Sequence, residues 1–87
     1  MRVRIEPLTL ERARERGASP EEIKDVVENG LSVPARGNRR ARAKIFPFKQ
    51  ERVGRFYDQK RIEVIYVEEA DTIVTITVHV FYGEWKV

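Results

Sequence analysis

The spacing of hydrophobic positions changes along the chain, from a helical repeat in the first third to a strand repeat in the last. In "SPEEIKDVVENG", the apolar side chains of "IKDVV" recur at i, i+3 and i+4, so that one stripe faces a core. Ser19 with Glu22 three residues later is a capping-box pattern, and Pro20 suits the first helical position. These signals predict a helix over residues 20–29, with Leu31 just past its end on the same apolar stripe.

The segment before this helix is more polar. "LTLERARERG" ends in glycine and places Leu10 and Ala13 at helical spacing, which predicts a first helix over about residues 9–16. The preceding "RVRI" favours an extended conformation. After the second helix, "LSVPARGN" is expected to be a loop, because Pro34 and Gly37 interrupt both the helical and the strand repeat.

Three segments in the second half favour strands. "RARAKIFPF" is the first, although Pro47 cannot donate to a strand ladder and so indicates an edge position or a bulge. "RIEVIYVEE" is rich in β-branched and aromatic residues and is followed by a turn at "EAD". The last, "TIVTITVHVFY", alternates along its whole length. One face is expected to carry Val74, Ile76, Val78, Val80 and Tyr82 against the helices, and the other Ile73, Thr75, Thr77, His79 and Phe81. The second face has a polar middle, on which a site could lie.

The order of helices first and strands afterwards, joined by short turns, predicts an α+β fold. We expect a single domain, residues 1–87, in which two N-terminal helices pack on one face of a three- or four-stranded antiparallel sheet. A chain of this size buries roughly 60% of the surface that it exposes when unfolded, which is enough for one core.

Charge is distributed unevenly along the sequence. The basic segment, Arg36 to Arg61, holds ten basic and two acidic residues, a net of +8, whereas the flanking segments are acidic. Such asymmetry indicates either a site for a polyanion or only the surface of a charge-rich protein, and we weight the two equally. The abundance of Glu and Arg would also suit a thermophile, in which ion-pair networks are commoner.

Composition removes several classes of chemistry. Without cysteine there is no disulfide, no thiolate nucleophile and no Cys-based zinc site, and a single histidine rules out a multi-histidine metal site. The sequence also has no Gly-rich phosphate loop and no Gly-x-Ser-x-Gly elbow. We therefore expect neither a metal nor another cofactor. No apolar run has the length of a signal peptide or a membrane span, so we expect a cytoplasmic protein without membrane contact.

His79 is the one side chain whose ordinary pKa lies near neutrality. It could act as a general acid or base in RNA cleavage, taking the proton of a 2′-hydroxyl while a nearby Arg or Lys stabilises the phosphorane. The alternative is an ordinary histidine on a sheet surface. From the residues alone we favour that alternative by about 3 to 1.

Aromatic residues are interleaved with the cations of the basic segment. Phe46, Phe48, Phe56 and Tyr57 lie within a few positions of Lys44, Lys49, Arg52 and Arg55. Cations that neutralise phosphate and rings that stack on unpaired bases are what recognition of single-stranded RNA requires. Two alternatives remain open: the cations keep an edge strand soluble, or they bind an acidic protein.

Four stretches together resemble a family of short prokaryotic proteins, the domain-of-unknown-function family DUF 4258. They are "RARERGASPEEIKDVVENG", "KIFPF", "GRFYDQKRIEVIYVEE" and "ITVHVFYGEW", and the resemblance covers about residues 8–85. That family is similar to the RelE-like ribonuclease toxins. The resemblance implies a metal-independent, RNA-directed activity, on free RNA or on the ribosome, in the toxin of a toxin–antitoxin pair.

Two positions depart from the family pattern. Relatives commonly have His-Ala where this chain has Leu8 and Thr9, and often have tyrosine in place of His79. The positions that carry over are Arg12, Arg16, Lys44, Gly54, Tyr57, Lys60 and the residues from Tyr82 to Trp85. RelE-like enzymes typically work with Arg, Lys and Tyr, which this composition provides.

The sequence therefore yields two sets of candidate residues. The catalytic candidates are His79, Tyr82 and Lys44, and the RNA-binding candidates are Arg36, Arg39, Arg40, Arg42, Arg55, Tyr57 and Lys60. The leading hypothesis is a RelE-like protein that binds or cleaves RNA. The second is a non-catalytic module that binds an acidic, antitoxin-like protein through the same basic surface, and the third is a structural homodimer formed through an edge strand.

Overall fold

The computed structural model describes residues 2–85, which form two helices and one five-stranded sheet. In chain order the elements are β1 (Arg2–Arg4), α1 (Pro7–Arg16), α2 (Pro20–Asn29), β2 (Leu31–Val33), β3 (Arg40–Arg52), β4 (Arg55–Glu69) and β5 (Thr72–Gly83). The α+β class predicted from the sequence is confirmed. Neither helix in this part of the chain is long and apolar enough to cross a membrane.

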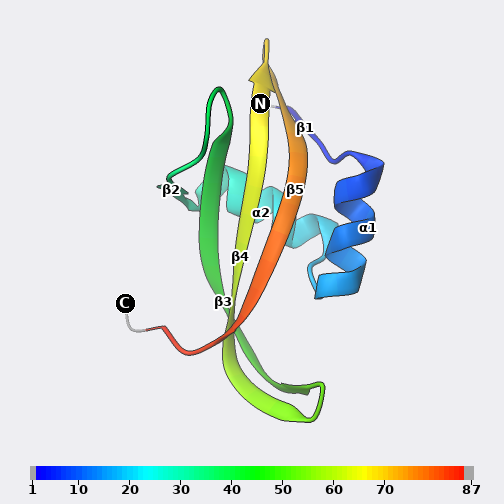
Figure 1. Ribbon diagram of the computed structural model, residues 1–87, viewed down its shortest axis with the longest axis vertical. Coiled ribbons are helices and arrows are strands. Elements are labelled where there is room, and N and C mark those ends of the chain that lie inside the picture. The colour runs from blue at the N-terminus through cyan, green and yellow to red at the C-terminus, as the bar shows by residue number, and fades with distance from the viewer. Residues whose placement is uncertain (1, 86–87) are drawn as a thin grey trace.

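The sheet has the order β1-β5-β4-β3-β2 (Figure 1). β3, β4 and β5 form an antiparallel meander, β2 pairs antiparallel with β3, and β1 pairs parallel with β5. The expectation of three or four antiparallel strands was therefore too simple, because the sheet is mixed and has five strands. The two added strands have three residues each and lie at the edges, where only pairing with a long neighbour holds them in place.

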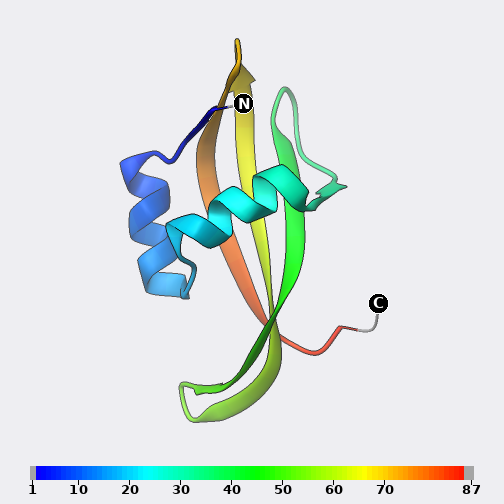
Figure 2. The same cartoon turned by 180° about the vertical axis from the view of Figure 1, so that it is seen from behind.

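Both helices pack against one face of the sheet, as predicted (Figure 2). In α2, Ile23, Val26 and Val27 are buried, and they meet Ile62 and Val64 of β4, which are fully buried. Burying each of these side chains contributes about 1.5–3 kcal/mol. This contact holds α2 across the sheet, and no helix among residues 2–85 covers the opposite face.

The ends of α2 follow from local sequence. The hydroxyl of Ser19 accepts the Glu22 N–H at 3.1 Å, and the Glu22 carboxylate accepts the Ser19 N–H at 3.0 Å, so the predicted capping box and the predicted span of residues 20–29 are both confirmed. α1 begins two residues earlier than predicted and ends at Gly17, which has a φ of +93°. A Cβ at Gly17 would collide with the Tyr82 hydroxyl, so glycine is required there both for backbone conformation and for space.

A bulge in β5 overturns the predicted assignment of faces for the residues before it, whereas Val78, Val80 and Tyr82 lie on the helix side as predicted. Ile65 pairs with Thr77 but Tyr66 pairs with Thr75, so Ile76 is an extra residue in β5. The alternation reverses there, and Ile73 and Thr75 lie on the helix side with Val78. Thr75 is 2% exposed, and its hydroxyl accepts the Glu6 N–H at 3.0 Å. The polar middle expected on the other face is therefore reduced to Thr77 and His79.

The loop expected after α2 contains β2, and Leu31 is not part of the core. Leu31 pairs with Ala43 and is 77% exposed, because the chain leaves the helix axis at Gly30. The prediction for Pro47 is confirmed: within the described part of the chain, β3 pairs only with β4 at this point, and a register shift follows between Pro47 and Gln50.

Candidate functional site

The cations of β3 and His79 lie on opposite faces of the sheet. Lys44 pairs with Ile62, which is buried beneath the helices, so Lys44 lies on the helix side. His79 pairs with Glu63, the next residue of β4, whose side chain projects to the other face. We call that other face the open face; its register positions are Ala41, Ala43, Ile45, Arg61, Glu63, Ile65, Thr77, His79 and Phe81. Of the three predicted catalytic residues, His79 and Lys44 are therefore not brought together.

Lys44 instead joins β3 to α2. Its ammonium group lies 2.8 Å from Asp25 Oδ2, and Asp25 also accepts a hydrogen bond of 2.8 Å from Asn29. These two hydrogen bonds, with that from Lys44 the larger contribution, hold the pKa of Asp25 below its usual value. Lys44 therefore has a partner that accounts for its charge.

Tyr82 and Arg52 hold the C-terminal end of α1. The Tyr82 hydroxyl donates to the Arg16 carbonyl at 2.6 Å, and Arg52 Nη2 donates to the Glu15 carbonyl at 2.9 Å. The last carbonyls of a helix have no partner within the helix, so these donors satisfy groups that would otherwise need water. Burial raises the pKa of Tyr82, which favours the neutral phenol that this hydrogen bond needs.

Lys60 makes a third contact with the same region. It is 8% exposed, and its ammonium donates to the Gly17 carbonyl at 2.9 Å while lying 2.9 Å from Glu22 Oε2. A buried lysine needs such partners, since an unpaired charge costs several kcal/mol to bury. Lys60, predicted to bind RNA, faces the junction of the two helices instead of solvent.

His79 lies beside a cation that sequence reasoning did not place in the site. Arg16 Nη1 is 3.4 Å from His79 Nδ1 and donates to the Val78 carbonyl at 2.6 Å. β5 is an edge strand at this point, because β1 pairs only with residues 72–74. The resemblance carried Arg16 over, yet only the β5 register could show that it meets His79.

The remaining RNA-binding candidates are divided between the two ends of the molecule. Arg36 and Arg39 lie in the exposed loop between β2 and β3, which is at the top of Figure 1. Arg40 starts β3 and lies 3.9 Å from Glu68, while Arg42 Nε is buried without a hydrogen-bond partner among residues 2–85. These four residues do not share a surface with Arg55 and Tyr57, which belong to the other end.

That other end is the turn of the long β3–β4 hairpin, which extends past both helices at the bottom of Figures 1 and 2. We call residues 48–57 the hairpin arm. Its cations and rings are Phe48, Lys49, Arg52, Arg55, Phe56 and Tyr57. Phe56 is 56% exposed, and Val53 at the turn is 96% exposed. The arm therefore presents both charged and apolar side chains to solvent.

Aromatic contacts hold the base of the arm. The ring centroids of Phe48 and Tyr57 lie 5.1 Å and 5.6 Å from that of Tyr82. The guanidinium carbon of Arg52 lies 4.9 Å from the Tyr82 ring centroid, and that of Arg55 lies 5.6 Å from the Tyr57 centroid. Each guanidinium is thus within cation–π distance of an aromatic ring, so that a positive charge and a π surface lie side by side.

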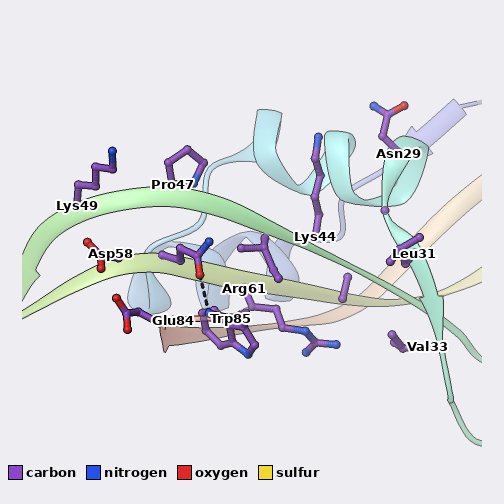
Figure 3. A pocket seen from close by; sticks show the side chains of 14 residues that line it. Asn29, Leu31, Val33, Lys44, Pro47, Lys49, Asp58, Arg61, Glu84 and Trp85 are labelled. Carbon is purple, nitrogen blue, oxygen red and sulfur yellow. Dashed lines mark hydrogen bonds between the residues drawn. The ribbon is translucent and has the colours of Figure 1, made fainter. Parts of the chain in front are cut away.

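A groove on the open face was not predicted. Its volume is about 830 Å³, and its apolar lining comes from Leu31, Val33, Ala43, Ile45, Pro47 and Trp85 (Figure 3). The backbone N–H of Trp85 donates to Gln59 Oε1 at 2.6 Å, and this hydrogen bond holds the segment after β5 against β4. No local pattern in the sequence indicates this groove, because it joins residues from the end of α2, from β2, β3 and β4, and from the segment after β5.

Two carboxylates lie at one end of this groove, with Leu31 and Val33 towards the other (Figure 3). Asp58 and Glu84 share a hydrogen bond and repel one another when both are ionised, which raises the pKa of Glu84. Neither makes a salt bridge with any of the described residues. Lys49 also lines this end of the groove, which therefore carries two carboxylates and one cation (Figure 3).

Comparisons with models of known protein families, with curated proteins and with solved structures found no match. Across residues 2–85, no group of three or more His, Cys, Asp or Glu side chains is arranged to hold a metal ion.

Proposed function

We propose that this chain binds single-stranded RNA through the hairpin arm. The observation that carries the proposal is the position of Arg55 over the Tyr57 ring, next to the exposed ring of Phe56. A guanidinium can neutralise a phosphate while the neighbouring rings stack on unpaired bases, at about 1–3 kcal/mol per base. Lys49, also exposed, adds a second phosphate contact on the same arm.

The backbone of the turn supports a functional role for the arm. Val53 has a φ of +51°, a left-handed conformation that is unfavourable for a β-branched residue, and its side chain is almost fully exposed. Asn-Gly is the preferred pair in such a two-residue turn, whereas this chain has Val53 and Gly54. A strained, apolar and solvent-facing tip contributes nothing to the core, so its purpose is better sought in contact with a ligand.

A binding titration with a short single-stranded RNA tests the proposal. Arg55→Ala should remove one phosphate contact and reduce the salt slope, and Phe56→Ala should weaken binding by roughly tenfold at every salt concentration. Arg2→Ala is the matched control, because Arg2 is exposed and pairs with Thr72 at the end of the sheet opposite the arm (Figure 1). If all three variants bind as the unaltered chain does, or if RNA does not bind at low salt, the proposal fails.

The contact between Arg16 and His79 favours a second candidate function, cleavage of the bound RNA. His79 would take the 2′-hydroxyl proton as the 2′-oxygen bonds to phosphorus, the P–O5′ bond breaks, and the 5′-oxygen takes a proton from solvent. Arg16 would stabilise the phosphorane. The expected product is a 2′,3′-cyclic phosphate, formed by the unaltered chain and by Lys44→Ala but not by His79→Ala. Equal rates for these three proteins would contradict it.

A further inference from the structure

The open face of the sheet is an unpaired layer. A sheet with helices on one side commonly has its other side either solvated or covered, and a groove lined by apolar side chains favours covering. Leu31, 77% exposed, and Phe81, 48% exposed, lie on this side with Trp85. What would cover the groove is decided by the charges at its ends.

Those two ends carry opposite charge. One end has the carboxylates of Asp58 and Glu84 with one cation, Lys49, so it remains net negative. The chain leaves the other end at Val33 and enters the loop that holds Arg36 and Arg39, both exposed and without a salt bridge to any residue between 2 and 85. Seven steps along β3, from Arg40 to Pro47, separate the two ends, so at the rise of a β-strand they are roughly 23 Å apart.

We propose that the open face docks a second copy of this chain across a two-fold axis through the groove. In a two-fold dimer the same surface of each copy faces the other in the opposite orientation. The loop with Arg36 and Arg39 of one copy then meets the Asp58 and Glu84 pair of the other, and this contact occurs at both ends of the interface. The two grooves are then covered by each other's apolar residues, as in an aligned sandwich of two sheets. Asn29 at the end of α2 and Lys49 of the arm line the groove and so border the interface, whereas α1 and the tips of both arms lie outside it.

This interface differs from an edge-strand dimer. The free edge of β3 before its bulge runs only from Lys44 to Pro47, which has no N–H to donate, so this edge is too short and irregular for strand addition. At the free edge of β5, the Val78 carbonyl already accepts a hydrogen bond from Arg16. An acidic partner protein is also disfavoured at the groove, because its unpaired carboxylates would repel it.

Charge reversal followed by mixing tests the dimer. One variant carries Arg36→Glu and Arg39→Glu, and the other carries Asp58→Lys and Glu84→Lys. Each alone should be monomeric, because like charges meet at both ends. An equimolar mixture should form a heterodimer, because every contact is then attractive, whereas a folding defect in either variant would not be repaired by mixing.

The measurement is sedimentation equilibrium over a concentration series, together with the emission of Trp85, the chain's single tryptophan. The unaltered chain should be a dimer with blue-shifted emission, and Leu31→Asp should raise the dissociation constant at least tenfold. Leu8→Asp is the matched control, since Leu8 is 55% exposed on α1, away from the groove. A monomeric unaltered chain, variants that dimerise normally alone, or a mixture that stays monomeric would each overturn the proposal. RNA binding by the arm is measured separately and can fail while the dimer stands.

Discussion

Replacing Lys60 tests whether the cations on the helix side hold the fold together or contact a ligand. In Lys60→Met the Gly17 carbonyl loses its donor and the Glu22 carboxylate loses its cation. Lys60 has a side chain 10% exposed and Glu22 one 25% exposed, so solvent can replace only part of these contacts. Breaking a fully buried pair costs 3–5 kcal/mol, and a hydrogen bond to a charged group contributes about 1.5–3 kcal/mol. Because Glu22 keeps the Ser19 N–H, we expect a loss of about 2 kcal/mol.

The assay is chemical and thermal unfolding followed by circular dichroism. For a domain of this size a loss of about 2 kcal/mol lowers Tm by roughly 10 °C. Lys24→Met is the matched control, because Lys24 is exposed on α2, the helix that carries Glu22. Its free energy of unfolding should change by no more than about 0.5 kcal/mol. Adding Glu22→Gln to Lys60→Met removes the unpaired charge and keeps a capping side chain, so the cycle should show about 1 kcal/mol of coupling.

RNA affinity gives the complementary result. Below its unfolding temperature Lys60→Met should bind RNA as the unaltered chain does, because Lys60 does not face solvent. The reasoning is refuted if Lys60→Met is as stable as Lys24→Met, or if the coupling energy is near zero. Lost RNA binding with unchanged stability would assign Lys60 to the ligand.

Three further changes test the contacts that position the arm and the sheet. Tyr82→Phe removes a hydrogen bond and should lower the free energy of unfolding by about 1 kcal/mol. Because the folded pKa of Tyr82 is raised above 10.0, the stability that this phenol contributes is present below pH 10 and should be lost as pH rises through the folded pKa. Urea unfolding at a series of pH values should show this alkaline loss in the unaltered chain, and Tyr82→Phe should lack the part linked to Tyr82. Thr75→Val should cost about 1–2 kcal/mol by leaving the Glu6 N–H unpaired, while Thr77→Val on the open face should cost under about 0.5 kcal/mol; equal effects would contradict the bulge in β5. Val53→Asn should raise stability by about 1 kcal/mol in thermal unfolding, because asparagine tolerates a positive φ; a lowered Tm would contradict the turn geometry.

Local signals predicted the helices well, and α2 most closely. Ser19, Glu22 and Gly30 act within their own segment, so their effect on the chain is the same whatever surrounds it. The faces of β5 could not be found in this way, because the bulge at Ile76 depends on which residues of β4 lie opposite. Leu31 was misplaced for a similar reason, since a three-residue edge strand exists only by pairing with β3.

The candidate site depended even more on pairing between distant segments. The letters "RARAKI" already alternate cations with small apolar residues, which indicates that Arg40, Arg42 and Lys44 share one face. Which face they share, and that His79 lies on the other, follows only from the register with β4. The aromatic and basic character of residues 48–57 was visible in the sequence, whereas their projection as an arm required the turn at Val53 and Gly54.

The most direct test of RNA binding by the arm is a nuclear magnetic resonance titration of ¹⁵N-labelled protein with single-stranded RNA. Amide shifts centred on residues 48–57, with little change at residues 36–44, are the predicted result. Shifts centred on Arg36 to Lys44, or on the open face around His79, with the arm unchanged, would contradict the account.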